Sequence, residues 1–220
     1  MFGEMLFGID EIDERVTLAI NQIHFPLTDQ LWMFMSNMYV WIPLYVLLVL
    51  SMWKNIGWKK TLVFAVMTTL AFVTCENIAN LFKDSVQRLR PCYNEFMLNG
   101  SLNLLEGRGG LYGFFSAHAA NAAAIAVVSI FAFSRDKDRS HRGFNAIIIS
   151  WAVLLAISRV FVGKHFLGDV LTGMMIGTLV GLIFGAAGNK ISARIDRQKD
   201  RPHSAARADN NLLAGSTVQR

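Results

Sequence analysis

Five apolar stretches, each about as long as a membrane-spanning helix, constrain this chain more than any other feature of its sequence. They cover residues 31–53, 61–82, 112–133, 144–162 and 166–187. A helix needs about 17–25 residues to cross about 30 Å of hydrocarbon. Because 53% of the 220 residues are apolar and only 17% are charged, we expect an all-α, polytopic membrane helix bundle with five transmembrane helices.

The N-terminal segment has a different pattern. Apolar residues recur in it at helical spacing: Ile9, Ile12, Val16, Ile20 and Ile23. Acidic residues take the other face, so residues 1–25 are predicted to form an amphipathic helix that lies at the membrane interface without crossing it. A cleavable signal begins with positive charge, whereas this segment begins acidic, so we expect it to stay on the mature protein.

The chain is therefore expected to have three parts: an interfacial segment over 1–30, a transmembrane domain over 31–188, and a basic tail over 189–220. After about Arg194 the tail is polar and poor in aromatic residues, which predicts disorder.

The distribution of Lys and Arg between the connections predicts the orientation. Fourteen lie in 54–60, 135–142 and the tail from Lys190 onward, whereas seven lie in the N-terminal segment, the connection 83–111 and the turn around Arg159 and Lys164. The more basic set and the C-terminus should be cytoplasmic. The other set then faces the periplasm or cell exterior of a multi-pass protein of the cytoplasmic (inner) membrane.

Three segments bring cations, hydroxyls, histidines and a carboxylate to that outer face: KDSVQRLRP (83–91), FFSAHAAN (114–121) and SRVFVGKHFLGD (158–169). Such a set suits a phosphate ester. The ammonium group of Lys83 and the planar guanidinium groups of Arg90 and Arg159 can bind the oxygens of a phosphate, and a guanidinium can do so with two parallel hydrogen bonds. A helix that starts near Ser116 can also point the free N–H groups of Ala117 and the next residue at an anion.

The two histidines of these segments suit different roles. His165 and Asp169 are four residues apart, so they share a helix face if the last helix has begun at His165, and the carboxylate can then hold the imidazole in one tautomer. We expect His165 to be a nucleophile that forms a phosphohistidine. His118 would donate a proton to the leaving group and accept one from the hydrolytic water. The scheme needs no metal and no cofactor.

These residues resemble the three-part signature of the type 2 phosphatidic acid phosphatases, also called lipid phosphate phosphatases, and of their bacterial membrane branch. The first part, Lys, six residues and Arg-Pro, is complete: Lys83, Arg90 and Pro91. The third, Ser-Arg, five residues, His, three residues and Asp, is also complete: Ser158, Arg159, His165 and Asp169.

The middle part departs from the family's Pro-Ser-Gly-His. Ser116 and His118 are kept, while Phe115 and Ala117 replace Pro and Gly. Alanine keeps the backbone N–H that would contact phosphate but reaches positive φ less freely than glycine. A loop that needs positive φ at residue 117 would be strained, although we expect activity to survive.

The resemblance implies an integral membrane hydrolase that removes a phosphate from a lipid (di)phosphate such as undecaprenyl diphosphate, lipid A, phosphatidylglycerol phosphate or phosphatidate. Its partners would be this substrate and the surrounding membrane lipids. A lipid phosphotransferase with the same histidine is one alternative, and a non-catalytic lipid-phosphate binder or transporter is another. Transport predicts polar residues through the full depth of several spans, whereas here they gather at one end.

Several further residues have simpler interpretations. Arg88 is expected to be either an accessory phosphate contact or a plain solvated charge, and Glu76 a structural partner inside the bundle. The acidic N-terminal helix and the connection 92–111 should cover the site. Cys75 and Cys92 make no disulfide framework, and no basic stripe with interleaved aromatics points to nucleic acid. The sequence leaves the oligomeric state open.

Overall fold

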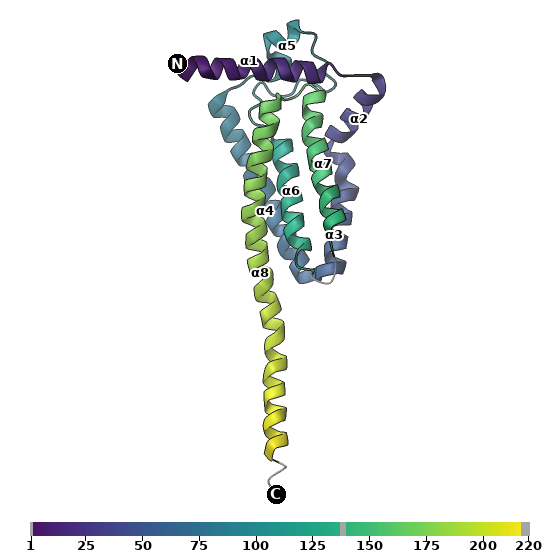
Figure 1. Ribbon diagram of the computed structural model, residues 1–220, viewed down its shortest axis with the longest axis vertical. Coiled ribbons are helices and arrows are strands. Elements are labelled where there is room, and N and C mark those ends of the chain that lie inside the picture. Colours follow the sequence, from purple (N-terminus) through teal and green to yellow (C-terminus); the bar gives the residue numbers. More distant parts are fainter. Residues whose placement is uncertain (1, 137–139, 217–220) are drawn as a thin grey trace.

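The computed structural model describes residues 2–136 and 140–216, and the chain in them is a bundle of long helices (Figure 1). The elements are α1 (Phe2–Asn21), α2 (Pro26–Ser36), η1 (Met38–Trp41), α3 (Ile42–Ile56), α4 (Trp58–Val86), η2 (Pro91–Tyr93), α5 (Glu95–Asn99), α6 (Ala117–Phe133), α7 (Arg142–Phe161) and α8 (Leu167–Ser216). The predicted all-α membrane bundle is confirmed.

Four helical segments are long and apolar enough to cross a membrane: Met38–Ile56, Trp58–Val86, Arg142–Phe161 and Leu167–Gln198. The remaining predicted span, 112–133, corresponds to α6, which is shorter, with 17 residues, and lies at the centre of the bundle against α4, α7 and α8. The termini lie at opposite ends of the molecule (Figure 1). The chain is a multi-pass membrane protein.

The first predicted span, 31–53, is wrong as one continuous helix. The helix α2 ends at Ser36, where Asn37 adopts extended backbone and its side chain accepts a hydrogen bond of 3.0 Å from the Tyr39 N–H. The helix α3 starts with Pro43 in its first turn, where the missing N–H costs nothing. The break lets Ser36 and Tyr39 turn toward the end of the bundle.

The predicted disorder of the tail is also wrong over the part that the structure describes, because α8 continues to Ser216. The tail contains several Ala and Arg residues, which favour helix. Asp196 also pairs with Lys60 at 2.8 Å and with Arg135, and these contacts hold α8 against the lower ends of α4 and α6. Residues 217–220 lie outside the described residues.

The central pair of helices, α6 and α8, approach closely because small residues line their contact. Four glycines of α8 lie at four-residue intervals on that side: Gly173, Gly177, Gly181 and Gly185. A Cβ at Gly181 would lie 2.8 Å from Val127 Cβ, so larger residues would force the helices apart. Small residues at such intervals are typical of close helix pairs in membranes.

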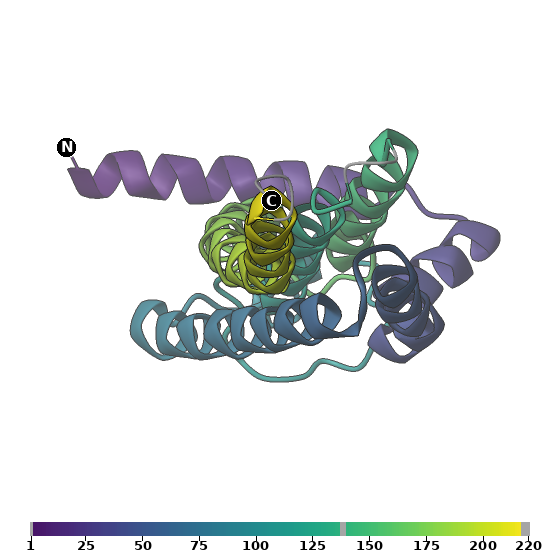
Figure 2. The ribbon, with the colours of Figure 1, turned by 90° about the horizontal axis from the view of Figure 1, so that it is seen from below.

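The helix α1 lies across one end of the bundle, against α7 and α8 (Figures 1 and 2). The side that it turns to the bundle carries the fully buried Thr17 and Asn21 together with Ile20, which packs against the core, whereas Ile12 and Val16 are 64% and 40% exposed. An interfacial helix needs this arrangement, with apolar side chains turned away from the protein. The side chain of Ile9 lies outside the part described.

Candidate active site

Four helix ends meet beneath α1: the C-terminal ends of α4 and α7 and the N-terminal ends of α6 and α8 (Figure 1). Lys83 lies in the last turn of α4. The chain then turns back, and the Arg90 N–H donates a hydrogen bond of 3.0 Å to Leu111 O. This pairing brings the segment after α4 beside the segment before α6.

A cavity of about 640 Å³ opens between these helix ends. Six of the eight site residues predicted from the sequence line it: Lys83, Arg90, Ala117, His118, Arg159 and His165. The other two, Ser116 and Asp169, are fully buried behind it. Residues up to 82 positions apart in the chain thus surround one space that is large enough for a phosphorylated head group.

One ring nitrogen of His165 faces the cavity, and the other faces Asp169. The Nε2 of His165 lies 3.4 Å from Arg90 Nη1, and its Nδ1 lies 3.5 Å from Asp169 Oδ2. Catalytic hydrogen bonds are often this long before substrate binds. Burial lowers the pKa of His165 to about 4, against the opposing effect of Asp169 and with help from Arg159. The imidazole is therefore neutral at pH 7.

The turn between α7 and α8 sets the position of His165. Gly163 adopts a φ of +74°, and a Cβ there would lie 2.9 Å from Asn103 O. Both facts require glycine. Ser158 is fully buried, and its hydroxyl donates a hydrogen bond of 2.6 Å to Leu155 O inside α7.

Ala117, which replaces the glycine of the middle motif, does not need a positive φ. Ala117 is the first residue of α6, and the non-glycine residues with positive φ in the described chain are Gln87 and Ser101. Ser116 caps the helix by accepting a hydrogen bond of 3.4 Å from the Ala119 N–H. The Ser116 N–H donates to Asp169 O at 3.0 Å, which ties the middle motif to the third one.

Oxygen atoms of the connection before α6 contact the cations around the cavity. Glu106 Oε2 lies 3.3 Å from Arg159 Nη1, and Glu106 Oε1 accepts a hydrogen bond of 2.5 Å from the Ser36 hydroxyl. Lys164 Nζ donates to Gly107 O. Burial lowers the pKa of Lys164, and the nearby Arg90 adds to this effect. The oxygens of the connection lie where phosphate oxygens would be expected.

The sequence pattern does not predict Ser36 or Glu106 as site residues. Ser36 falls in a stretch that has the pattern of a membrane span, and Glu106 is marked only by its place in a connection expected to cover the site. Glu76, expected to be a structural partner, lines the cavity and accepts a hydrogen bond of 2.6 Å from Asn121 Nδ2.

The expectation for Arg88 is wrong. Its side chain does not line the cavity, and its guanidinium contacts Asp169 and Asp13, each at 2.8 Å. Two carboxylates attract this cation more strongly than an open cavity would, and they come from segments that the sequence does not show to be adjacent. Cys75 and Cys92 are both buried and free.

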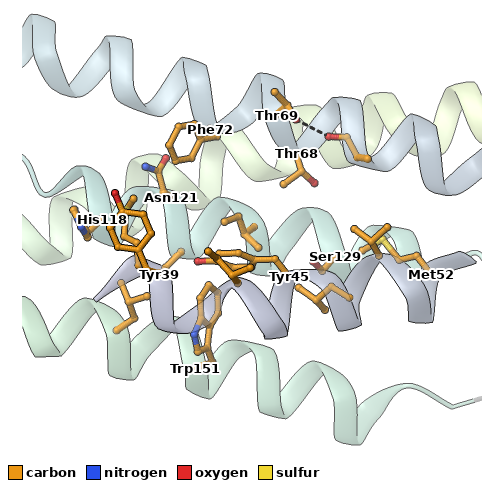
Figure 3. Close-up of a pocket in the computed structure, with 18 residues that line it drawn as sticks. Tyr39, Tyr45, Met52, Thr68, Thr69, Phe72, His118, Asn121, Ser129 and Trp151 are labelled. Carbon is orange, nitrogen blue, oxygen red and sulfur yellow. Dashed lines mark hydrogen bonds between the residues drawn. The ribbon is translucent and has the colours of Figure 1, made fainter. Parts of the chain in front are cut away.

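A second, mostly apolar cavity of about 510 Å³ adjoins the first. It is lined by α3, α4, α6 and α7, and the two cavities share Met38, Tyr39 and His118. Figure 3 shows His118 and Tyr39 at one end of the row of lining side chains and Met52 at the other. We call this second cavity the apolar groove.

A membrane helix bundle with cations, two histidines and a helix N-terminus around one cavity has the architecture of a membrane phosphatase. The family model of the PAP2 superfamily matches residues 58–191. That range contains all eight predicted site residues. The chain belongs to the PAP2 superfamily, and the predicted class of enzyme, a phosphatase of phosphate esters, is confirmed.

Individual relatives agree with this assignment. The lipid A 4'-phosphatase of Bacteroides thetaiotaomicron is 30% identical over 90% of this chain and 85% of its own length. The undecaprenyl-diphosphatase of Sulfolobus acidocaldarius is 27% identical over 83% and 82%. The solved structure of a transmembrane PAP2 type phosphatidylglycerolphosphate phosphatase from Bacillus subtilis has a TM-score of 0.67 and 24% identity over 84% of this chain and 88% of that one, which shows a shared fold.

Proposed function

We propose that this protein removes a phosphate from a phosphorylated membrane lipid, with the head group in the cavity and a hydrocarbon chain in the apolar groove. The observation that carries the proposal is that the two cavities adjoin at His118, which lines both. A lipid phosphate has the same two parts, a charged end and an apolar one. The lipid would enter sideways from the membrane, because the groove lies between helices that span it.

The chemistry proceeds in two steps. The neutral Nε2 of His165 attacks phosphorus, the P–O bond to the lipid breaks, and His118 gives a proton to the leaving oxygen. Water then attacks the phosphohistidine, His118 takes the proton of that water, and the P–N bond breaks to release phosphate. Asp169, beside Nδ1, stabilises the positive charge that the ring carries in the intermediate.

The cations supply the charge that the transferring phosphoryl group needs. Arg90 lies 3.4 Å from the attacking nitrogen, and Lys83 and Arg159 line the same space. The N-terminus of α6 adds the free N–H groups of Ala117 and His118. Preformed donors of this kind stabilise developing charge without reorganisation. The scheme needs no metal.

Among substrates, the phosphate of lipid A is the first candidate and undecaprenyl diphosphate the second. The relative from Bacteroides thetaiotaomicron, whose name specifies lipid A, matches most of both chains. The name of the relative from Sulfolobus acidocaldarius specifies undecaprenyl diphosphate. Phosphatidylglycerol phosphate and phosphatidate complete the set to be compared.

The proposed orientation places the cavity on the periplasmic side and the C-terminus in the cytoplasm. The end of the bundle away from the cavity carries Lys54, Lys59, Lys60 and Arg135, as the positive-inside bias requires. We also keep the division into an interfacial segment (1–30), a transmembrane phosphatase domain (31–188) and a cytoplasmic tail (189–220), the last now helical in its described part.

The test is phosphate release by the detergent-purified protein from these four lipids, with EDTA present. We expect release from at least one lipid, and its loss in His165→Ala. The matched control is His24→Ala, because His24 is half-exposed and pairs only with Asp29 among the described residues. Release by His165→Ala at the unmodified rate would contradict the proposal.

Two other outcomes would also count against hydrolysis. Binding of the lipids without any release would make the protein a lipid-phosphate binder. Transfer of the phosphate to added glycerol in place of water would make it a phosphotransferase.

A further inference from the structure

Arg88 lies between Asp169 and two carboxylates of α1, the well-buried Asp13 and the exposed Asp10, whose Oδ1 lies 3.1 Å from Arg88 Nη2. The Nη1 of Arg88 lies 2.8 Å from Asp169 Oδ1, and its Nη2 lies 2.8 Å from Asp13 Oδ2. The side chain of Asp169 is fully buried, and those of Asp13 and Arg88 are only 13% and 17% exposed. Although burial opposes it, Asp169 and Asp13 raise the pKa of Arg88, so the bridge stays charged.

The helix α1 also caps the start of α8. Asp13 Oδ1 accepts a hydrogen bond of 2.9 Å from the Gly168 N–H, and Thr17 Oγ1 accepts one of 2.9 Å from the Leu167 N–H. These N–H groups lie in the first turn of α8, where backbone N–H groups have no acceptor within the helix. The side chains of Asp13 and Thr17 in α1 therefore act as an N-cap for α8.

The same face of α1 also caps the end of α7. Asn21 Nδ2 donates hydrogen bonds to Val160 O at 3.1 Å and to Phe161 O at 3.0 Å. Both helix ends that flank the His165 turn are thus held by α1.

The bridge restricts the carboxylate that faces His165. Asp169 Oδ1 is held by Arg88, while Asp169 Oδ2 accepts a hydrogen bond of 3.1 Å from the Phe166 N–H and faces His165 Nδ1. With both oxygens engaged, the carboxylate cannot rotate away from the imidazole. The guanidinium also stacks on the Phe166 ring, 4.3 Å from its centroid, which holds it in place.

We propose that Arg88 is a positioning residue, which, anchored by Asp13 of α1, fixes Asp169 against His165. The interfacial helix is then a part of the reaction centre as well as a membrane anchor. The proposal rests on the proposed function, because it takes His165 as the nucleophile. Arg88 acts through Asp169, since it is absent from the cavity lining and its two terminal nitrogens face carboxylates.

The test compares kcat, KM and orthovanadate binding for Arg88→Gln, Asp13→Asn, the double variant and His165→Ala. Asparagine at position 13 still accepts from Gly168 but lacks the charge that holds Arg88. The matched controls are Arg15→Gln and Glu11→Gln, whose ion pair is exposed on the same helix. Orthovanadate titration counts intact sites, so kcat is expressed per binding site.

We expect Arg88→Gln to lower kcat by about 100-fold, because a misplacement of about 1 Å costs that much. KM and the vanadate dissociation constant should stay within about twofold of the wild-type values. Asp13→Asn should lower kcat by about tenfold in the wild type and have no further effect in Arg88→Gln, since it acts through that residue. The two controls should match the wild type.

Three results would overturn the proposal. A rise in KM and in the vanadate constant would make Arg88 a phosphate contact, and an unchanged kcat per site would make it merely structural. If the effects of Arg88→Gln and Asp13→Asn on kcat were additive, Asp13 would not act through Arg88. Turnover by His165→Ala is distinct from all of these, because it would refute the proposed function itself.

Discussion

Replacement of Glu106 by glutamine should strengthen the binding of phosphate-like anions. Glu106 Oε2 lies 3.3 Å from Arg159 Nη1, so an anion that binds this arginine must displace the carboxylate. Glutamine has nearly the same shape and still accepts a hydrogen bond from Ser36. The substitution therefore removes the negative charge and leaves the packing in place.

The geometry sets the size of the effect. Two unit charges at this distance attract each other by about 5 kcal/mol at an effective dielectric constant of about 20. The side chain of Glu106 is 29% exposed, so solvent screening reduces the net cost of displacement to about 1–2 kcal/mol. This free energy corresponds to a dissociation constant about 5- to 30-fold lower.

The assay is orthovanadate inhibition of phosphate release, with the inhibition constant measured for both proteins. Glu95→Gln is the matched control, because Glu95 is an exposed acid in the same connection. An inhibition constant for Glu106→Gln that is equal to or higher than the wild-type value would refute the reasoning. In that case the carboxylate would hold Arg159 ready for the anion instead of competing with it.

Three further predictions follow from the His165 turn and the apolar groove. Because burial lowers the pKa of His165 to about 4 and only the neutral ring attacks, protonation of this nucleophile should lower kcat/KM only as the pH falls past about 4. A drop near pH 6.5 would contradict this. Gly163→Ala should lower the free energy of unfolding by more than about 1 kcal/mol, because Gly163 has a positive φ. Gly143→Ala should not lower it, because the space around a Cβ at residue 143 is open. Thermal unfolding in detergent measures both variants. Ala122→Phe should fill the groove and raise KM for a long-chain lipid phosphate by about tenfold while leaving hydrolysis of a short-chain one unchanged; equal effects on both would show that the groove holds no chain.

The site was predictable to the extent that its residues lie at fixed spacing near helix ends. His165 and Asp169 lie just before and within the first turn of α8, and Lys83 and Arg90 flank the end of α4, so a linear motif records their geometry. The membrane bundle was predictable for a similar reason, since a long apolar run leaves few alternatives to a helix.

Contacts between distant segments were not predictable in this way. Arg88 is 75 residues from Asp13, and nothing in a single sequence shows that the two segments meet. The pairing of Glu106 with Ser36 depends on the break at Asn37, which overrides an otherwise continuous apolar run. The glycines of α8 were a readable signal, because their four-residue spacing is typical of close helix contacts.

The central claim, phosphoryl transfer through His165, is tested most directly by trapping the intermediate. The protein would be mixed with lipid carrying a labelled phosphate and quenched in alkali, because acid hydrolyses the P–N bond of phosphohistidine. We predict label on residue 165 of the wild type and none on His165→Ala, which also releases no phosphate. Label on a different residue, or full release by His165→Ala without any labelled protein, would contradict the account.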